Sequence, residues 1–390
     1  MPMAKSYAEI NERIRKGEAV VLTAEEVVAF ASENGVEAVA EKVDVVTTGT
    51  FGPMCSTGAF INFGHSEPPI KMSKVWLNNV PAYAGLAAVD AYIGATELSE
   101  REGMKYGGAH VIQDLIDGRP VKLRAVSYGT DCYPRTDIET WVSLETLNQA
   151  YLFNPRNVYQ NYAVATNTSE ETLFTYMGTL LPRLGNATYC SAGALSPMLN
   201  DPRYRTIGVG TRIFVGGAKG YVAWEGTQHN PNQARDDHSV PTAPAGTLAL
   251  IGDLREMDST FIRACTLTNY GTSMFVGVGI PIPVLDEDIA RTVSLGEDSL
   301  TATVLDYGVR SRSRPALGKV TYAELRSGRI KINGKDVMTG SISSLAKARQ
   351  IAGRLKEWIE RGEFLLSEPL QPLPSEQGFK PLDITSGEAI

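Results

Sequence analysis

The stretch VDVVTTGTFGPMCSTGAFINFGHSEPPIKM, residues 43–72, joins two kinds of sequence pattern. Its first eight residues, 43–50, are apolar and β-branched, which predicts a buried strand. From Phe51 onward, glycines and prolines interrupt any helical or strand period, and the stretch holds one of only 4 cysteines in the chain. Loops at strand ends are where α/β proteins place reactive groups. We therefore interpret residues 51–72 as a loop that presents Cys55 for chemistry.

A second loop repeats this arrangement. Residues 121–129, VKLRAVSYG, alternate as a strand does, and TDCYPR follows with Cys132 and Arg135. Two strand-end loops that each carry a cysteine predict a reactive site built from both.

The remaining patterns predict an α/β fold, with a mixed α+β arrangement also open. Helices are expected in residues 6–34, in the middle of 80–98, and in 110–118, 169–185 and 341–364. Strands are expected within 207–285 and at 300–308, and the Asn-Gly pair in 330–337 predicts a hairpin. The polar residues 227–246 form too long a connection for a plain turn. We expect a large catalytic unit in 1–325, a hairpin and amphipathic helix packed on it in 326–366, and an extended, poorly anchored tail in 367–390.

The composition of the chain excludes several classes of function. The 390 residues carry 37 basic and 44 acidic side chains, a net charge of −7, which is unlike a nucleic-acid-binding surface. No apolar run is long enough to span a membrane, and the N-terminus lacks the apolar centre of a signal peptide. With so few cysteines, disulfides cannot be the framework of the fold. We expect a cytoplasmic enzyme with reduced thiols.

The candidate site residues cluster around the two loops. Cysteine reacts as the thiolate, which needs exposure and cationic or hydrogen-bonding neighbours. Cys55 is followed by polar residues and by His65 and Lys71, and backbone N–H groups in such a turn can bind an anion. Arg135 beside Cys132 could hold a carboxylate with two parallel hydrogen bonds. The candidates for contact with the substrate are Ser56, Thr57, Lys71, Arg135 and His229.

The sequence gives weaker evidence for a functional role of the other two cysteines. Cys190 lies in CSAGA, which is similar to CSTGA at residues 55–59, so two similar turns could present two thiols. Cys265 lies between apolar residues and is expected to be a small buried hydrophobe.

Three long motifs carry a resemblance to a known family: PMCSTGAFINFGHSEPPIKM, WLNNVPAYAGLAAVDAYIGAT and YGTDCYPR. GTRIFVGGAKGYVAWEGTQH and VGVGIPIPVLDEDIA extend it over about residues 10–360. The chain resembles the homocysteine-biosynthesis proteins, the L-aspartate semialdehyde sulfurtransferases, in a form without the C-terminal pair of CBS domains. The resemblance implies conversion of L-aspartate semialdehyde to homocysteine with sulfide-level sulfur and two electrons. It also implies functional cysteines at Cys55 and Cys132 and a ferredoxin-like protein that donates electrons or sulfur.

This chemistry suits two thiols. One cysteine can carry a persulfide to the aldehyde carbon, and the second can resolve it to a disulfide, provided that the two Cα atoms come within roughly 7 Å. Lys71 or Arg135 could bind the substrate carboxylate, and His65 could move a proton to the departing oxygen.

Two alternatives remain open at this point. Cys55, Cys132 and Cys190 could hold a four-iron, four-sulfur cluster whose fourth iron binds hydrosulfide, because thiolates are the usual cluster ligands. The chain could instead be a non-catalytic sulfur carrier or a docking scaffold for a ferredoxin. A homodimer is expected from the frequency of that state among oligomers.

Overall fold

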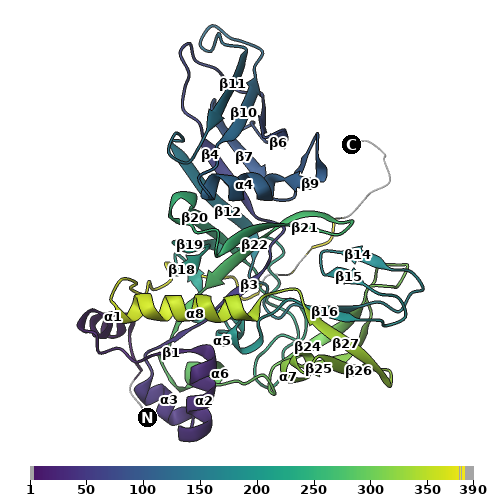
Figure 1. Ribbon diagram of the computed structural model, residues 1–390. Coiled ribbons are helices and arrows are strands. Elements are labelled where there is room, and N and C mark those ends of the chain that lie inside the picture. Colours follow the sequence, from purple (N-terminus) through teal and green to yellow (C-terminus); the bar gives the residue numbers. More distant parts are fainter. Residues whose placement is uncertain (1–3, 377, 379, 383–390) are drawn as a thin grey trace.

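The computed structural model describes residues 4–376, 378 and 380–382. Its described part is a mixed α/β fold, as the sequence predicts. A central sheet carries a narrower sheet above it in Figure 1, a second large sheet lies below and to the right, and most helices gather below and to the left. Among the described residues, no helix is both long enough and apolar enough to cross a bilayer.

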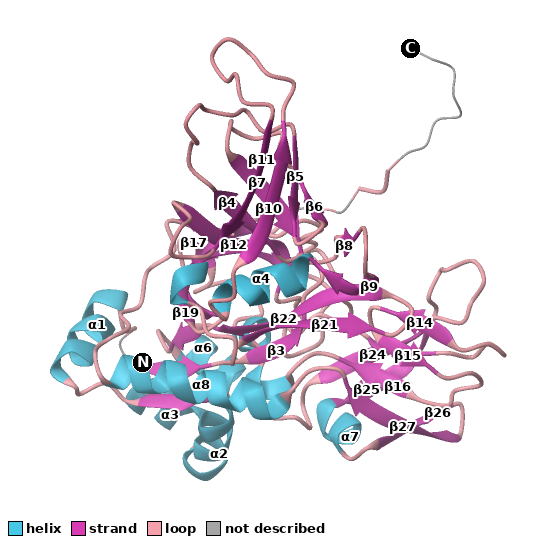
Figure 2. Cartoon of the chain, turned by 45° about the horizontal axis from the view of Figure 1, so that its top comes forward, coloured by secondary structure: helices cyan, strands magenta, loops and turns pink. Residues whose placement is uncertain are grey.

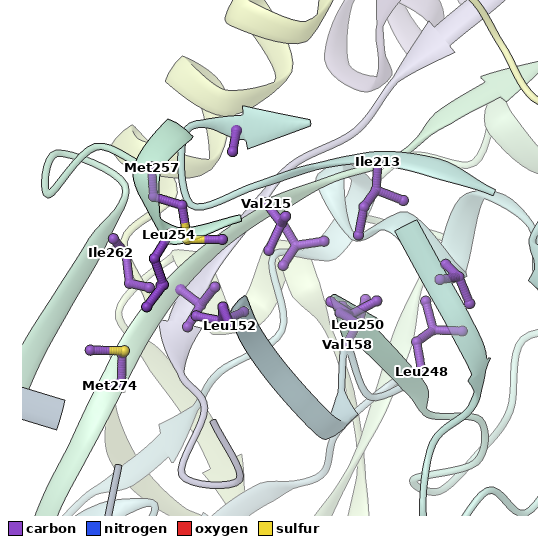
Figure 3. Close-up of a cluster of buried hydrophobic side chains, with 14 of the residues drawn as sticks. Leu152, Val158, Ile213, Val215, Leu248, Leu250, Leu254, Met257, Ile262 and Met274 are labelled. Atoms are coloured by element: carbon purple, nitrogen blue, oxygen red, sulfur yellow. The ribbon is translucent and has the colours of Figure 1, made fainter. Parts of the chain in front are cut away.

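The central sheet has nine strands, which pair in antiparallel fashion. Its apolar side chains form the main core, part of which Figure 3 shows around Leu152, Val215 and Leu250. The strands in spatial order are β21 (Ile262–Leu267), β22 (Gly271–Gly279), β18 (Arg212–Val215), β19 (Ala218–Glu225), β20 (Leu248–Asp253), β12 (Gln149–Asn157), β4 (Gly58–Asn62) and β7 (Asp90–Gly94), with β3 (Thr50–Pro53) paired to β22.

A four-stranded antiparallel sheet, which we call the arm, projects from the central sheet (Figures 1 and 2). Its alternating strand β10 buries every second side chain, the pattern expected for residues 121–129. The loops 63–73 and 127–136 contact each other at its far end, which we call the arm tip. The arm strands are β11 (Asp137–Val142), β10 (Val121–Val126), β5 (Lys74–Leu77) and β6 (Val80–Ala82).

A six-stranded mixed sheet forms the second large layer. The predicted hairpin turns at Asn333 and Gly334, both with positive φ, and its second strand pairs in parallel with β16. The hairpin is therefore an integral part of this sheet. Its strands are β25 (Ala316–Thr321), β24 (Thr301–Asp306), β13 (Val164–Thr166), β16 (Ala187–Tyr189), β27 (Lys335–Ser341) and β26 (Arg329–Ile332).

The longest helix, α8 (Leu345–Glu360), is the predicted amphipathic helix, and it packs its apolar side on β3 and β22. The N-terminal helices begin with capping boxes at Ser6 and Thr23. The remaining helices are α1 (Tyr7–Lys16), α2 (Ala24–Asn34), α3 (Val36–Lys42), α4 (Gly108–Ile116), α5 (Pro197–Asn200), α6 (Glu287–Val293) and α7 (Tyr322–Arg326). Short 3₁₀ turns occupy η1 (Gly193–Leu195) and η2 (Leu254–Glu256).

Small sheets complete the described structure. A three-stranded sheet holds β1 (Val21–Thr23), β2 (Val45–Thr47) and β23 (Pro281–Pro283). Three two-stranded sheets pair β8 (Leu98–Ser99) with β9 (Gly103–Gly107), β14 (Leu173–Thr175) with β15 (Gly178–Leu180), and β17 (Gly208–Val209) with β28 (Gln371–Pro372).

Two predicted helices are wrong. Residues 80–98 form β6, β7 and the start of β8, because alternate burial of Ala91 and Ile93 gives β7 the period of a strand. Residues 169–185 form the β14–β15 hairpin, in which Gly178 takes a positive φ of 85° after the turn. Small and apolar residues in these segments concealed a strand period.

The first residues of the predicted C-terminal tail, 367–390, are anchored to the body of the chain. Ser367 accepts a hydrogen bond from the Arg212 backbone, β28 pairs with β17, and Leu373 is buried. Residues 383–390 lie outside the described part of the chain.

Candidate active site

A cavity of about 520 Å³ lies where the ends of β3 and β12 meet loops of the six-stranded sheet. Among the described residues, two cysteines and two arginines line it, and no Asp or Glu does. The lining residues are Pro53, Met54, Cys55, Ser56, Arg156, Asn157, Tyr159, Tyr162, Tyr176, Met177, Cys190, Gln228, Asn230, Gln233, Pro244, Ala245, Tyr270, Arg314 and Ile342. In a chain with a net charge of −7, this wall is locally cationic.

Cys55 lies in a tight turn between β3 and β4. The turn closes when the Thr57 N–H donates to the Met54 carbonyl at 3.1 Å, and the Thr57 hydroxyl donates to the same oxygen at 2.7 Å. Only glycine fits at position 58, the next residue, because a Cβ on Gly58 would lie 2.2 Å from the Tyr92 hydroxyl. The irregular loop predicted for residues 51–72 is therefore wrong in its first half, where two strands flank a turn. The loop itself covers only residues 63–73.

Ser273 on β22 lies beside the Cys55 thiol, with 3.1 Å between Sγ and Oγ. Burial raises the pKa of Cys55, and the hydrogen bonds with Ser273 and with the Cys55 backbone oppose that rise only in part. The resting thiol is therefore mostly protonated at neutral pH. A cation that approaches it would favour the thiolate.

Cys190 follows β16 and lies on the wall contributed by the six-stranded sheet. Its carbonyl oxygen accepts a hydrogen bond from the Ser343 hydroxyl, which fixes the loop. Burial raises the pKa of the Cys190 thiol to about 12. Two thiols thus line one cavity from different sheets.

Tyrosines form one side of the cavity in a continuous edge-to-face arrangement. The rings of Tyr159 and Tyr162 are 4.8 Å apart, and Tyr176 lies 6.2 Å from Tyr162 and 6.3 Å from Tyr270. Burial raises the pKa of Tyr162 strongly, so its hydroxyl stays neutral. Arg314 donates to the Tyr176 hydroxyl at 2.7 Å and stands 4.4 Å above the ring of Tyr307.

The sequence of the chain has a clear relationship to known proteins. The family described as homocysteine biosynthesis enzyme, sulfur-incorporation, matches residues 19–366. The chain belongs to this family. It is an enzyme of homocysteine biosynthesis, and the resemblance found in the motifs is confirmed.

Two relatives of this homocysteine-biosynthesis enzyme are named L-aspartate semialdehyde sulfurtransferase. The protein from Methanosarcina acetivorans is 52% identical over 98% of the chain and 74% of its own length. The one from Methanocaldococcus jannaschii is 52% identical over 95% of the chain and 73% of its own length. An uncharacterised protein of Methanothermobacter thermautotrophicus is 31% identical over 84% of the chain. No solved structure matches.

Several residues that the sequence proposed for this enzyme's site lie at the arm tip. Cys132 and Lys71 are exposed there, and the exposed His65 stacks on the ring of Tyr133 with 5.9 Å between centroids. The Arg135 guanidinium donates to the carbonyl of Pro68 at 3.0 Å and to that of Glu67 at 2.7 Å. None of these residues lines the cavity that contains Cys55.

The other proposed residues are inside the body of the enzyme. Ser56 lines the cavity beside Cys55. Thr57 is buried and accepts a hydrogen bond from Asn154 Nδ2 at 2.8 Å. His229 is buried next to the cavity wall, where Nδ1 accepts from the Thr247 N–H at 3.1 Å and Nε2 lies 3.1 Å from the Pro374 oxygen. Both ring nitrogens of His229 are therefore used within the fold. Cys265 is half-buried rather than buried, on β21 opposite Ser273.

The iron–sulfur hypothesis does not fit one chain of this enzyme. Cys55 and Cys190 line the cavity, whereas Cys132 is at the arm tip. Within the described residues, no three His, Cys, Asp or Glu side chains gather as a metal site would require. A cluster needs its thiolates around one point, so we derive no step from it.

The sequence reasoning missed Arg156, Asn157, Arg314, Ser273 and the tyrosines. The segment NPRNVYQNY at 154–162 held a usable signal, since two asparagines flank Pro-Arg among aromatic residues inside a strand pattern. Arg314 and Ser273 had no such signal, because only the tertiary structure brings the Arg314 loop to the cavity and places Ser273 beside Cys55.

Proposed function

We propose that the enzyme converts L-aspartate semialdehyde to L-homocysteine with sulfide-level sulfur and two external electrons, and that Cys55 is the thiol that carries the sulfur. The position of Cys55 supports this most directly. It lines a cavity that also holds two arginines and no acidic side chain, which suits an anionic substrate and a thiolate. The names of the two relatives at 52% identity support the substrate.

The proposed reaction balances as a persulfide and disulfide cycle. Hydrosulfide opens a Cys55–Cys132 disulfide, which leaves a persulfide on Cys55 and a thiolate on Cys132. The terminal sulfur of the persulfide adds to the aldehyde carbon, and the aldehyde oxygen takes up a proton. The Cys132 thiolate then attacks the Cys55 sulfur, which re-forms the disulfide and releases a thiohemiacetal. Loss of water gives a thioaldehyde, which two external electrons and two protons reduce to homocysteine.

In this proposal Cys132 reaches Cys55 from a second copy of the chain. Cys132 is exposed at the end of a projecting arm and is outside the cavity of its own chain. A homodimer in which each arm tip covers the partner's cavity would bring the two thiols together. The same arrangement would carry His65, Lys71 and Arg135 toward the substrate. His65 would then move the proton to the departing oxygen.

The electrons come from an external donor in this proposal. A ferredoxin-like protein, which the family resemblance implies, is the proposed donor. The thioaldehyde accepts its electrons, while the disulfide returns to its starting state in each cycle.

Mixed dimers test the proposal. Chains with Cys55→Ala and chains with Cys132→Ala are given different affinity tags, co-expressed and purified as mixed dimers under anaerobic conditions. Homocysteine formation is then measured with the semialdehyde, sulfide and a reductant. Each pure variant should be inactive, and the mixed dimer should regain about half of the wild-type activity, because one complete site remains.

The outcomes separate the parts of the proposal. An inactive mixed dimer, with both pure variants inactive, would reject action between two chains. Full activity in the Cys55→Ala protein would reject the sulfur-bearing role of Cys55. When the wild-type protein is first oxidised to the Cys55–Cys132 disulfide and then exposed to sulfide, mass spectrometry should find one added sulfur atom on the Cys55 peptide.

A further inference from the structure

The segment that follows Asn154 is distorted where it reaches the cavity. The pairing of β12 with β20 shifts register between Asn154 and Asn157, as a β-bulge does. Bulges turn side chains in new directions and are frequent beside active sites. Val158 has a φ of 49°, a conformation that is costly for a β-branched residue. Strain of this kind persists where the surrounding structure holds a functional geometry.

Two donor groups in this segment have no hydrogen-bond partner among the described residues. The Nε of Arg156 and the Nδ2 of Asn157 are buried without a hydrogen bond from any described residue. Asn157 is only 2% exposed, and its Oδ1 already accepts from the Val158 N–H at 2.6 Å. A buried donor without a partner destabilises the fold. Both residues line the cavity, so a bound ligand can supply the missing acceptors.

The required ligand group is an anion with more than one acceptor oxygen. Both unpaired groups are donors, and Arg314 adds a second cation whose guanidinium is held by Tyr176 and Tyr307. The absence of Asp and Glu from the cavity lining leaves these cations uncompensated there. A carboxylate matches a guanidinium in planar, two-bond geometry.

We propose that Arg156 and Asn157, with Arg314 beside them, bind the carboxylate of the amino-acid substrate. This inference rests on the proposed function, because it takes L-aspartate semialdehyde as the substrate. It replaces Arg135 and Lys71, the residues that the sequence suggested for this role.

The fold links this carboxylate site to the reacting thiol. Asn154 Nδ2 donates to Thr57 in the Cys55 turn, and Asn154 Oδ1 accepts from the Arg156 N–H at 3.0 Å. One buried side chain therefore ties the Cys55 turn to the backbone of Arg156. A substrate held by its carboxylate at Arg156 would have its aldehyde carbon placed relative to Cys55.

Two anions of the reaction could occupy the site: the substrate carboxylate and hydrosulfide. The planar guanidinium and the neighbouring amide favour the carboxylate, since hydrosulfide offers a single acceptor atom. The test therefore measures KM for both substrates.

The experiment compares Arg156→Ala, Arg156→Lys and Asn157→Asp with wild type in the full-length enzyme. Asn157→Asp keeps the acceptor for the Val158 N–H, removes the donor and adds a negative charge. Arg354→Ala is the matched control, because this arginine lies half-exposed on α8 with only Glu357 as its ion-pair partner. Thermal unfolding confirms that each variant folds.

We expect KM for L-aspartate semialdehyde to rise on the order of 10- to 100-fold in Arg156→Ala and Asn157→Asp, while KM for sulfide stays near wild type. The KM of Arg156→Lys for the semialdehyde should lie between that of these two variants and that of wild type, because lysine keeps the positive charge and lacks the planar guanidinium. Succinic semialdehyde retains the carboxylate and should show the same rise. 3-Aminopropanal lacks it, so its weak turnover should be the same in wild type and in Arg156→Ala.

Two results would overturn the inference. One is an unchanged KM for the semialdehyde in folded Arg156→Ala and Asn157→Asp proteins. The other is a rise in KM for sulfide alone, which would assign the site to hydrosulfide. Failure of the proposed function is a separate observation, namely that the wild-type enzyme itself forms no homocysteine.

Discussion

The cavity and the arm tip contain similar residues in opposite surroundings. Each has a cysteine in a turn or loop after a strand, with an arginine that the fold holds in place. At the cavity, Cys55 is half-buried among tyrosines, and Arg156 keeps an unpaired donor. At the arm tip, Cys132 is exposed, and Arg135 uses its donors on the carbonyls of Glu67 and Pro68. The difference teaches that unpaired donor groups mark the region that can bind a substrate, whereas the arm tip offers an exposed thiol and an arginine whose donors are already used.

The largest expected effect is at the cavity. Replacement of Cys55 by Ala should lower the rate of homocysteine formation on the order of 10³-fold or more, because a lost reacting group cannot be replaced by its neighbours. The rate is measured anaerobically with sulfide and a reductant. Cys265→Ala is the matched control, a half-buried thiol on β21 whose loss should change the rate only a few-fold. Equal losses in the two variants would contradict the special position of Cys55.

The rates at which the thiols are alkylated should differ according to their surroundings. In the fully reduced protein, Cys132 should react first with iodoacetamide at neutral pH, since it is exposed, and Cys190 should react last. Burial raises the pKa of Cys55, and that of Cys190 to about 12, so both are protonated at neutral pH and the rates at both should climb with rising pH. The Cys55 rate should keep increasing beyond the ordinary thiol pKa of about 8.5. Peptide mass spectrometry gives the alkylation rate of each cysteine. Faster labelling of Cys55 than of Cys132 would contradict the expected order.

Replacement of Ser273 should have a smaller effect, on the reactivity of the Cys55 thiol. Ser273→Ala removes the hydroxyl that lies 3.1 Å from the Cys55 sulfur and opposes the rise in its pKa. The Cys55 pKa should rise further, and alkylation of Cys55 at mildly alkaline pH should slow by about 2- to 10-fold. Ser273→Thr restores a hydroxyl and should recover most of the rate. An unchanged rate in Ser273→Ala would mean that this hydrogen bond has no influence on the thiolate.

The smallest effect is expected for Arg135, one residue of the arm tip. Arg135→Ala should lower the free energy of unfolding by no more than about 1 kcal/mol, because its two hydrogen bonds are solvent-exposed. Its KM for the semialdehyde should stay within about threefold of wild type, in contrast to Arg156→Ala. Denaturant unfolding and steady-state kinetics measure the two quantities. A rise in KM as large as that of Arg156→Ala would show that Arg135 binds the substrate carboxylate.

Strong local patterns predicted a large share of the elements. The alternation in 121–129 and the capping box at Thr23 formed the predicted strand and helix start, because each depends on neighbours within a few residues. The β-branched run at 43–50 formed a strand only at Val45–Thr47, and Thr50 begins β3 in a different sheet. Residues 80–98 and 169–185 were misread because their small and apolar residues fit a helix as well as a strand. The pairing of β7 with β4 and of β14 with β15 decided these segments.

The sequence by itself determined the family and the mixed α/β class, and it singled out Cys55 as a candidate, because long motifs and local periodicity depend only on consecutive residues. The tertiary structure alone decided which side chains share the cavity. Arg156, Cys190 and Arg314 are far apart in the chain and meet at the cavity, and strand pairing places Ser273 beside Cys55. It also separated Cys132 from Cys55 within one chain, because β10 and β11 carry their connecting loop to the far end of the arm.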